Sequence, residues 1–582
     1  MGTIEPRVKF GEARPKNGDV KCLIVFLIAF VTHLVLGFVV MSSENVYIGS
    51  VANKPADFQQ CSGFTGSFVY CSEKLLEELQ ECENSPGGRR LLGSGSDDEN
   101  DHATVFSVFG DYPAIPSTAV VMIVAISVIW CFILRAIPHG MVWGTMAIKV
   151  ALWIGIGVWF KYQSSNTGAD LDTQAYLCWA FAGLFVAFIF YHRSKYERAG
   201  DHLEMAMKGL LARPAIFGYA AIVEVVYLVY LAVYTFFVTR TSVVWEVGRD
   251  EFGRCGVKMA GWSSNSMYFI TFMMIWTTYY AKNTNLVISS MALGSWYFGD
   301  EGAPDNITRS AFKTALTSSA GTISIGSLVT AITQELLRLA RNKLWWTNPW
   351  GCVLKIILVM VQKMIEALTK FSMIMHAFSG EDFFTSAKDC YGVMKKHFFQ
   401  GMITDSVGQS VVTLGAYVFS LGVGFATWAW VDNKYGWKTL GTAFPGEESW
   451  EYLFYVFMIL FVWLTLYPMR TIFVVSILTT YLTGYYSAPL TALFVSCVAN
   501  IVLSFVGSLV INGMDTMFVC YAIGKEKNFQ PQDQSMYILL GEIAVGGADG
   551  APHVANQQQQ YIGGPVATAV PVAQAVPAKS YV

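Results

Sequence analysis

Long apolar segments separated by short polar ones dominate the hydropathy pattern of this chain of 582 residues. The first apolar segment, residues 22–41, has the roughly 20 residues that a helix needs to cross a bilayer. Further apolar segments of similar length lie at 115–134, 140–160, 171–191, 214–238 and 263–281. The pattern therefore predicts an all-α fold, a polytopic transmembrane bundle of about 10–12 spans.

Polar residues interrupt the apolar pattern in the second half of the chain. We interpret the break at 282–285 as a tight hairpin, not as one bent helix, so that the sequon at Asn306 lies outside as a candidate glycosylation site. Residues 313–337 are then expected to run inward. The lysine-rich segment 350–377 is expected at the inner surface, where long basic side chains reach water. The remaining predicted spans are 405–430, 452–467, 471–486 and 490–512.

Charge decides which side of the membrane each loop faces. The chain is 54% hydrophobic and 14% charged, well below the roughly 25% charged residues of soluble proteins. Basic residues before residue 22 place the N-terminal segment, 1–21, in the cytoplasm. The loop 42–114 has twelve acidic and four basic residues and is expected on the extracellular or lumenal side. A net charge of −3, without a basic stripe, argues against nucleic acid as a partner.

Four cysteines fall in the predicted outer loops. Cys61, Cys71 and Cys82 lie in the acidic loop, and Cys255 lies in a later one. In an oxidising compartment these four are expected to form two disulfides, whose pairing the sequence leaves open. At the other end, residues 524–582 are rich in Gln, Ala, Val and Pro. They are predicted to form a disordered cytoplasmic tail.

Ionisable residues inside predicted spans are costly to bury and are therefore candidates for function. Glu224 lies about ten residues into its span, with Tyr227 one helical turn further on. A carboxylate beside tyrosines suggests a cation site, whereas the alternative is a protonated Glu224 or a pair with Lys149. For His33 and His376 the alternative to function is a packed, neutral imidazole.

Aromatic residues recur at spacings of three and four between 268 and 280, and they include Trp276 and Tyr279. An aromatic face holds a quaternary ammonium with about 0.5–2 kcal/mol per contact. Trp276 and Tyr279 therefore join Glu224 and Tyr227 as candidate substrate-binding residues. The alternative is ordinary packing and the aromatic belts of lipid-facing helices.

Small residues cluster at 321–331, in the sequence GTISIGSLVTA. Gly321 and Gly326 are candidates for a broken or sliding helix along a translocation path. The alternative is close helix packing, which small residues permit in lipid.

Residues 379–397 form a polar interruption inside the predicted transmembrane core, 115–523. Gly380 and Asp382 end an apolar run, and basic residues follow, so we expect a cytoplasmic hinge here. Thr385 and Ser386 are expected to cap a helix that covers 387–397.

Three stretches resemble the choline transporter-like membrane protein family, in the same order along the chain. They are GTISIGSLVTAITQ at 321–334, GEDFFTSAKD at 380–389 and DTMFVCY at 515–521. The resemblance covers about the C-terminal half, and residues 2–308 match only in pattern. The family usually has ten spans, so the pair at 452–467 and 471–486 looks like an insertion.

The resemblance implies a carrier that moves choline, or a related amine such as ethanolamine, across a membrane. It implies a multi-pass protein of the plasma membrane that is not an enzyme and needs no cofactor or metal. The sequence lacks the H-E-x-x-H motif of zinc hydrolases. A membrane-bound acyltransferase with His376 as base, and a lipid scramblase or channel, remain alternatives.

Overall fold

The computed structural model describes residues 19–42, 59–62, 68–71, 77, 79–82, 89–90, 114–167, 172–242, 245–249, 254–259, 261–298, 306–343, 349–394, 398–435 and 488–527. The chain divides into two units, Met1–Asp533, which holds all of these residues, and Gln534–Val582. The predicted spans at 452–467 and 471–486, and the predicted tail beyond Lys527, lie outside the described residues.

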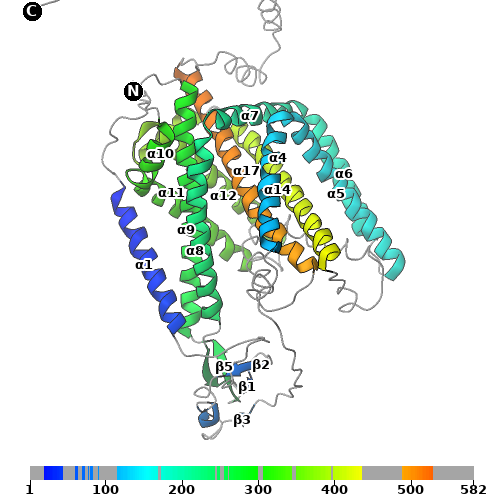
Figure 1. Ribbon diagram of the computed structural model, residues 1–582, viewed down its shortest axis with the longest axis vertical. Coiled ribbons are helices and arrows are strands. Elements are labelled where there is room, and N and C mark those ends of the chain that lie inside the picture. Colours follow the sequence, from blue (N-terminus) through cyan, green and yellow to red (C-terminus); the bar gives the residue numbers. More distant parts are fainter. Residues whose placement is uncertain are drawn as a thin grey trace, which may run out of the picture. The chain divides into compact units, whose positions relative to one another are not determined.

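Helices make up most of the described part of the chain (Figure 1). Seven of them are long and apolar enough to cross a membrane: α1 (Val20–Ser42), α4 (Ala114–Ala136), α5 (Pro138–Thr167), α6 (Asp172–Tyr191), α8 (Ala215–Ser242), α14 (Phe398–Tyr435) and α17 (Ala488–Lys527). The pair α10 (Ile307–Leu316) and α11 (Ala320–Lys343), bent by 65°, counts as an eighth if it forms one span. The predicted all-α, polytopic helical bundle is therefore confirmed.

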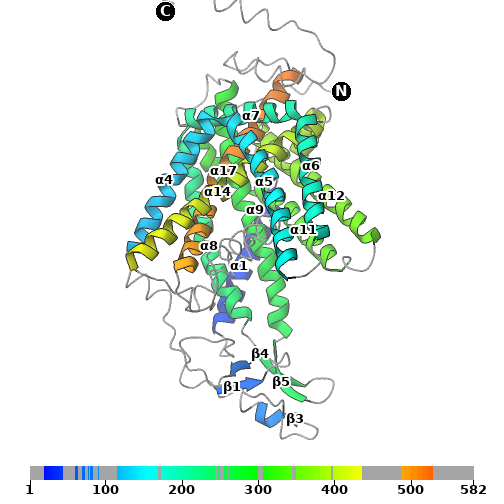
Figure 2. The same ribbon diagram turned by 90° about the vertical axis from the view of Figure 1, so that its right-hand side faces the viewer.

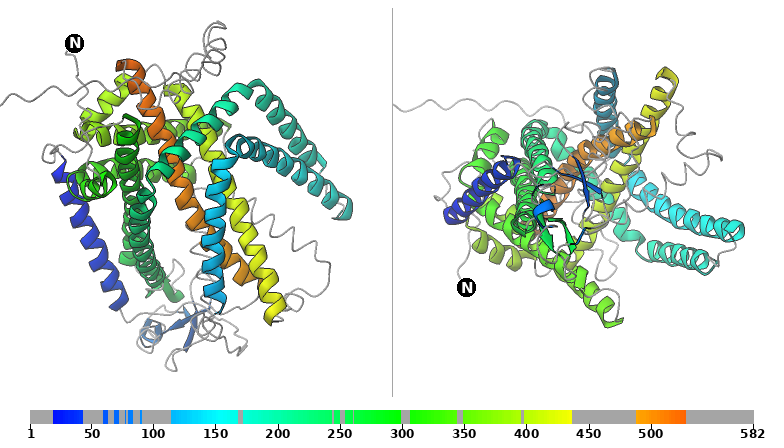
Figure 3. Two further views of the ribbon diagram at one scale, coloured as in Figure 1. Left: turned by 45° about the horizontal axis from the view of Figure 1, so that its top comes forward. Right: turned by 90° about the horizontal axis from the view of Figure 1, so that it is seen from below.

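Some side chains of the apolar helices pack against other helices, and others are exposed on the outside of the bundle. On α4, Ala119 and Ile123 pack against Val495 and Ala499 of α17, while Val121 is 67% exposed. In water such exposure of a large apolar side chain would be unfavourable, but lipid tails are as apolar as valine. The helices α14 and α17 lie side by side in this part of the bundle (Figure 3).

The predicted hairpin at 282–285 is wrong. The helix α9 runs without a break from Gly261 to Phe298, because the polar side chains are bonded inside the bundle. The Asn283 side-chain amide donates to the Ser327 hydroxyl of α11 (2.9 Å), and the Thr284 hydroxyl donates to the Tyr280 carbonyl (2.7 Å). Asn283 and Thr284 therefore have partners without a turn to solvent.

Because α9 has no hairpin, the elements that follow it run in the opposite direction to the predicted one. The ring of Phe312 in α10 lies 5.0 Å from that of Tyr219, near the start of α8. The start of α11 lies beside Asp19, at the start of α1, so α11 runs parallel to α1. The predicted opposite directions of residues 22–41 and 313–337 are therefore wrong. The exposed Asn306 lies at the same end as the start of α1, and its glycosylation stays a prediction.

The segment 350–377, predicted at or near the inner surface, is helical and packs on the bundle; its place relative to the membrane stays a prediction. It belongs to α12 (Pro349–Ser379), which packs on α9 and α11 and does not lie apart from the bundle. The Phe371 and Phe378 rings are buried, and the Phe378 ring lies 6.4 Å from that of Phe298 in α9. The helix α7 (Arg193–Ala212) packs on α5, α14 and α17, with His139 of α5 3.2 Å from Asp201.

Short strands join the two cysteine-containing loops at the far end of α1 and α8 (Figure 2). The strands are β1 (Gln59–Ser62), β2 (Phe68–Cys71), β3 (Arg89–Arg90), β4 (Trp245–Arg249) and β5 (Arg254–Met259). The β3-β5-β4 sheet connects both loops, and a disulfide links Cys82 to Cys255. In the β1–β2 hairpin, Gln59 lies opposite Cys71 and Cys61 opposite Val69. A second disulfide, between Cys61 and Cys71, stays a prediction.

The polar interruption near residue 380 is a sharp junction between two helices. The helix α12 ends at Ser379. The next residue, Gly380, has a φ of 74°, which suits glycine, and its N–H donates to the His376 carbonyl (2.8 Å). The next helix, α13 (Phe383–Met394), begins four residues earlier than predicted. Its cap is Asp382, which accepts from the Thr385 hydroxyl (2.6 Å) and N–H (3.3 Å). The predicted caps are therefore wrong, because Ser386 is buried and donates to the Glu381 carbonyl (3.3 Å).

Replacing Asp382 by Ala should lower the free energy of unfolding by about 1 kcal/mol at neutral pH, as expected for a lost helix cap. The hydrogen bond from the Thr385 hydroxyl lowers the pKa of Asp382. The contribution is therefore complete above the ordinary aspartate pKa and is lost as the pH falls through the lowered value. Thermal unfolding in detergent at several pH values measures this. Asp382→Asn is the control, since asparagine also caps but does not titrate, and equal stability of Asp382→Ala and wild type would contradict the assignment.

Single cysteines placed at Asn306, Lys388 and Ser165 test which helix ends lie on the same side of the membrane. In a chain without its other free cysteines, an impermeant thiol reagent should label positions 306 and 388 from one side only. It should label position 165, at the opposite end of α5, from the other side. Labelling of positions 306 and 165 from the same side would contradict a continuous α9 and would support the predicted hairpin at 282–285.

Candidate functional site

The carboxylate of Asp19 holds three segments of the chain together. Its Oδ2 atom accepts one hydrogen bond from the Thr322 hydroxyl of α11 (2.6 Å) and another from the Phe383 N–H of α13 (3.0 Å). Asp19 is only 9% exposed. Hydrogen bonds to a charged group are worth about 1.5–3 kcal/mol each. Asp19 therefore ties the start of α1 to the stretches at 321–334 and 380–389.

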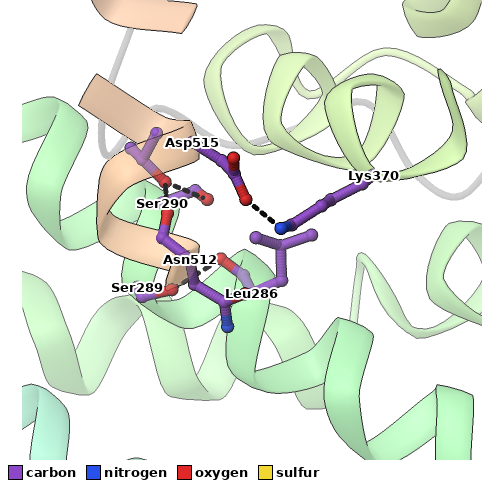
Figure 4. Close-up of polar contacts among 7 residues, drawn as sticks. Leu286, Ser289, Ser290, Lys370, Asn512 and Asp515 are labelled. Carbon is purple, nitrogen blue, oxygen red and sulfur yellow. Dashed lines mark hydrogen bonds and ion pairs between the residues drawn. The ribbon is translucent and has the colours of Figure 1, made fainter. Parts of the chain in front are cut away.

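The third matched stretch contributes a buried ion pair. Lys370 of α12 and Asp515 of α17 form an ion pair between side chains that are 22% and 3% exposed, respectively (Figure 4). The neighbouring Thr516 hydroxyl shares a hydrogen bond with the Ser290 hydroxyl of α9 (2.9 Å). The three helices α9, α12 and α17 thus meet at one polar centre, in which the segment expected at the membrane surface supplies the cation.

Hydrogen bonds also join α1, α9 and α11. The Trp276 indole N–H donates to the Ser324 carbonyl (3.2 Å), and the Ser324 hydroxyl donates to the Cys22 carbonyl (3.2 Å). The ring of Phe26 packs edge-on against Trp276, with the ring centroids 5.0 Å apart. Trp276 is 3% exposed. Its indole is therefore a packing element between three helices.

Glu224 and Tyr227 lie on the side of α8 that faces α9. The Tyr227 hydroxyl shares a hydrogen bond with the Thr278 hydroxyl (2.9 Å). Lys282 interacts electrostatically with Glu224, and its ammonium stands 5.3 Å from the centroid of the Tyr279 ring. The alternative partner of Glu224, Lys149, belongs to α5, which packs mainly on α6 and α7. Three of the four predicted site residues are thus linked through Lys282 and Thr278.

Trp276 does not join that group. An α-helix turns by about 100° per residue, so positions 276 and 278 point in nearly opposite directions. Thr278 faces Tyr227 of α8, whereas Trp276 faces α1 and α11. Trp276 therefore contacts α1 and α11, whereas Tyr227 contacts Thr278; the substrate-binding role of Glu224, Tyr227, Trp276 and Tyr279 stays a prediction.

Gly321 and Gly326 permit close packing. A Cβ atom on Gly321 would lie 2.5 Å from the Asp19 carbonyl oxygen, and one on Gly326 would lie 3.0 Å from the Met373 sulfur. The helix α11 is unbroken at both glycines, and the bend from α10 falls before it, between residues 316 and 320. The expectation of a broken helix at these glycines is wrong, and the packing alternative describes them.

The two candidate histidines, His33 and His376, are in contact with neighbouring groups. His33 is fully buried, and its Nε2 atom lies 3.4 Å from the Tyr230 hydroxyl. The Nδ1 atom of His376 forms a short hydrogen bond with the Glu381 carbonyl. His376 thereby braces the junction between α12 and α13.

Comparison with known proteins decides the family. The family model described as "Plasma-membrane choline transporter" matches residues 176–526, more than half of the chain. The chain belongs to this choline transporter-like family. The match begins in α6 and ends in α17, so it includes the Lys370–Asp515 pair and the α8–α9 contacts but not Asp19.

Curated relatives of the family are distant in sequence. Protein PNS1 of Gibberella zeae is 25% identical over 317 residues, which cover 51% of this chain and 56% of that protein. A CTL-like protein of Dictyostelium discoideum is 22% identical over 455 residues, or 72% of each chain. Protein PNS1 of Neurospora crassa is 28% identical over 171 residues, 28% of this chain and 31% of the relative. The chain thus spans about half the length of the first of these relatives.

Signals in the sequence for the polar centres of this family member are weak. Asp515 begins the third matched stretch, which marks it as notable, but nothing pointed to Lys370 as its partner 145 residues earlier. Asp19 lies in a short segment next to basic residues, where a carboxylate at a helix start is unremarkable. The contacts of Asp19 and the Lys370–Asp515 pair can be recognised only once helices distant in the sequence are placed in space.

Gly321→Ala should destabilise the protein by about 1–3 kcal/mol, as expected for overpacking, because the new Cβ atom would collide with the Asp19 backbone. The matched control is Gly422→Ala in α14, where a Cβ atom meets nothing within 4 Å. Thermal unfolding in detergent compares the two. Equal midpoints for both variants would show that the start of α11 is not held against Asp19.

Proposed function

We propose that this family member is a carrier that moves choline, or a related amine such as ethanolamine, across the plasma membrane. The observation that carries the proposal is the family match over residues 176–526. It covers the helices in which buried carboxylates meet the hydroxyl and aromatic side chains. Residues 1–21, the junction near 380 and the tail are assigned to the cytoplasm, and the loop 42–114 to the opposite side.

The chemistry of the substrate fits the face shared by α8 and α9. A quaternary ammonium cannot donate a hydrogen bond, so a carboxylate and aromatic faces are its natural partners. Glu224 supplies the charge, and Tyr227 and Tyr279 supply rings. Lys282, which already stands near Glu224 and over Tyr279, occupies this region as the protein's own cation. Substrate binding then requires the Lys282 ammonium to move away.

Uptake of labelled choline by the purified full chain in liposomes tests the proposal. A carrier predicts uptake that saturates with choline concentration and is competed by ethanolamine. Linear, non-saturating flux would indicate a channel, and movement of labelled lipid would indicate a scramblase. Release of an acylated product, abolished by His376→Ala, would indicate an acyltransferase.

Variants of the α8–α9 face should separate binding from folding. Glu224→Gln should raise the KM for choline about tenfold or more, the equivalent of ~1.4 kcal/mol. Tyr279→Leu should raise it by roughly 2- to 30-fold, for a cation–π contact of about 0.5–2 kcal/mol. The matched aromatic control is Trp276→Phe, which should leave KM unchanged because Trp276 faces α1 and α11.

The opposite pattern would contradict this site. If Trp276→Phe raises KM while Glu224→Gln transports choline as the wild type does, the cation lies on the other side of α9. The thermal unfolding midpoint of each variant, measured in the same detergent, distinguishes a lost contact from a misfolded protein.

A further inference from the structure

The Lys370–Asp515 pair lies outside the site on α8 and α9, and the proposed function does not use it. We propose that Asp515 is a second cation-binding site for the transported amine, and that Lys370 fills this site when the amine is absent. The inference rests on the proposed function, because it takes a small cationic amine as the substrate.

Stability alone gives little reason for this pair. Asp515 is almost completely buried, and the cost of removing two charges from water largely offsets their attraction. Apolar residues in place of a buried pair are often neutral or stabilising. In a membrane protein, ionisable residues that face the bundle interior commonly mark the path of an ion or substrate.

The position of the pair connects it to the first site. Tyr279, Lys282, Leu286 and Ser290 follow one another on α9 at spacings of three, four and four residues, so they share one face of the helix. At a rise of 1.5 Å per residue, the eleven residues from Tyr279 to Ser290 span roughly 16 Å. One face of α9 thus leads from Tyr279 to Ser290, which lies at the Asp515 centre; Figure 4 shows Leu286 and Ser290 at this end.

The groups around Asp515 fit the chemistry of choline and ethanolamine. Both compounds carry a cation and, two carbons away, a hydroxyl group. Asp515 offers a buried carboxylate. The hydroxyl of the next residue, Thr516, lies 2.9 Å from the Ser290 hydroxyl of α9. The cationic group of the substrate, a primary ammonium in ethanolamine and a larger trimethylammonium in choline, can take the place of the Lys370 ammonium without a change in net charge.

Lys370 is suited to act as the exchangeable cation. Its side chain is 22% exposed, whereas Asp515 is 3% exposed, so the lysine has room to withdraw and the aspartate does not. Lysine is a flexible side chain with a compact charge. At the first site Lys282 lies over the Tyr279 ring and interacts electrostatically with Glu224. Both proposed sites therefore contain a lysine that competes with the substrate.

The test compares four variants of the full chain in detergent and in liposomes: Asp515→Asn, Lys370→Gln, the double variant with both changes, and the swap Lys370→Asp with Asp515→Lys. Choline-induced stabilisation measures binding, and labelled choline uptake measures transport. Lys370→Gln should bind choline about tenfold more tightly, because the competing cation is gone. Asp515→Asn and the double variant should lose choline binding at this site and transport at least tenfold more slowly.

The double variant and the swap decide between exchange and a structural pair. Neither leaves a single unpaired charge, so both should unfold near the wild-type temperature, yet neither should transport choline at the wild-type rate. Transport at the wild-type rate by the double variant, or unchanged choline affinity in Lys370→Gln, would overturn the inference. The control is Lys208→Gln, which breaks a surface pair with Glu204 on α7 and should change nothing. Wild-type protein that moves no amine would instead refute the proposed function.

Discussion

The carboxylate of Asp19 is the contact on which one end of the bundle depends. It lies where the chain enters the first apolar helix, and it accepts hydrogen bonds from the starts of two helices more than 300 residues away. Gly321 and Gly380 make this possible, the first by letting α11 approach the Asp19 backbone and the second by turning the chain after α12. The three segments then form one unit at this end.

The same constraint explains the polar interior. In lipid, a polar group without a partner costs several kcal/mol, which favours partners inside the protein for the polar side chains of α9. Asn283 bonds to Ser327, Trp276 to the Ser324 carbonyl, and Ser290 to Thr516. The helix α9 packs on α8, α11, α12 and α17. This central position is the reason why we place the proposed path for an amine along α9.

The sequence predicted what depends on length and composition. Residues 20–42 and 215–242 are helices of membrane length because their apolar runs are long enough, and the charge asymmetry agrees with the grouping of Cys82 and Cys255. The sequence failed where a polar residue has a distant partner. Residues 282–285 look like a turn in the sequence, but Asn283 has a hydrogen-bond partner in the Ser327 hydroxyl. Lys370 looks like a surface residue, but it forms an ion pair with Asp515. Trp276 and Thr278 share a motif but lie on nearly opposite faces of α9, which a linear pattern does not separate.

A double-mutant cycle between Asp19 and Thr322 tests most directly whether this contact holds the segments together. Asp19→Asn, Thr322→Val and the double variant would be compared with the wild type by thermal unfolding in detergent. Contacting residues in one network are coupled by roughly 0.5–3 kcal/mol, whereas independent sites add within about 0.3–0.5 kcal/mol. We expect a coupling above about 1 kcal/mol, because the bond is charge-assisted and Asp19 is buried. Additive effects of the two substitutions would contradict the account.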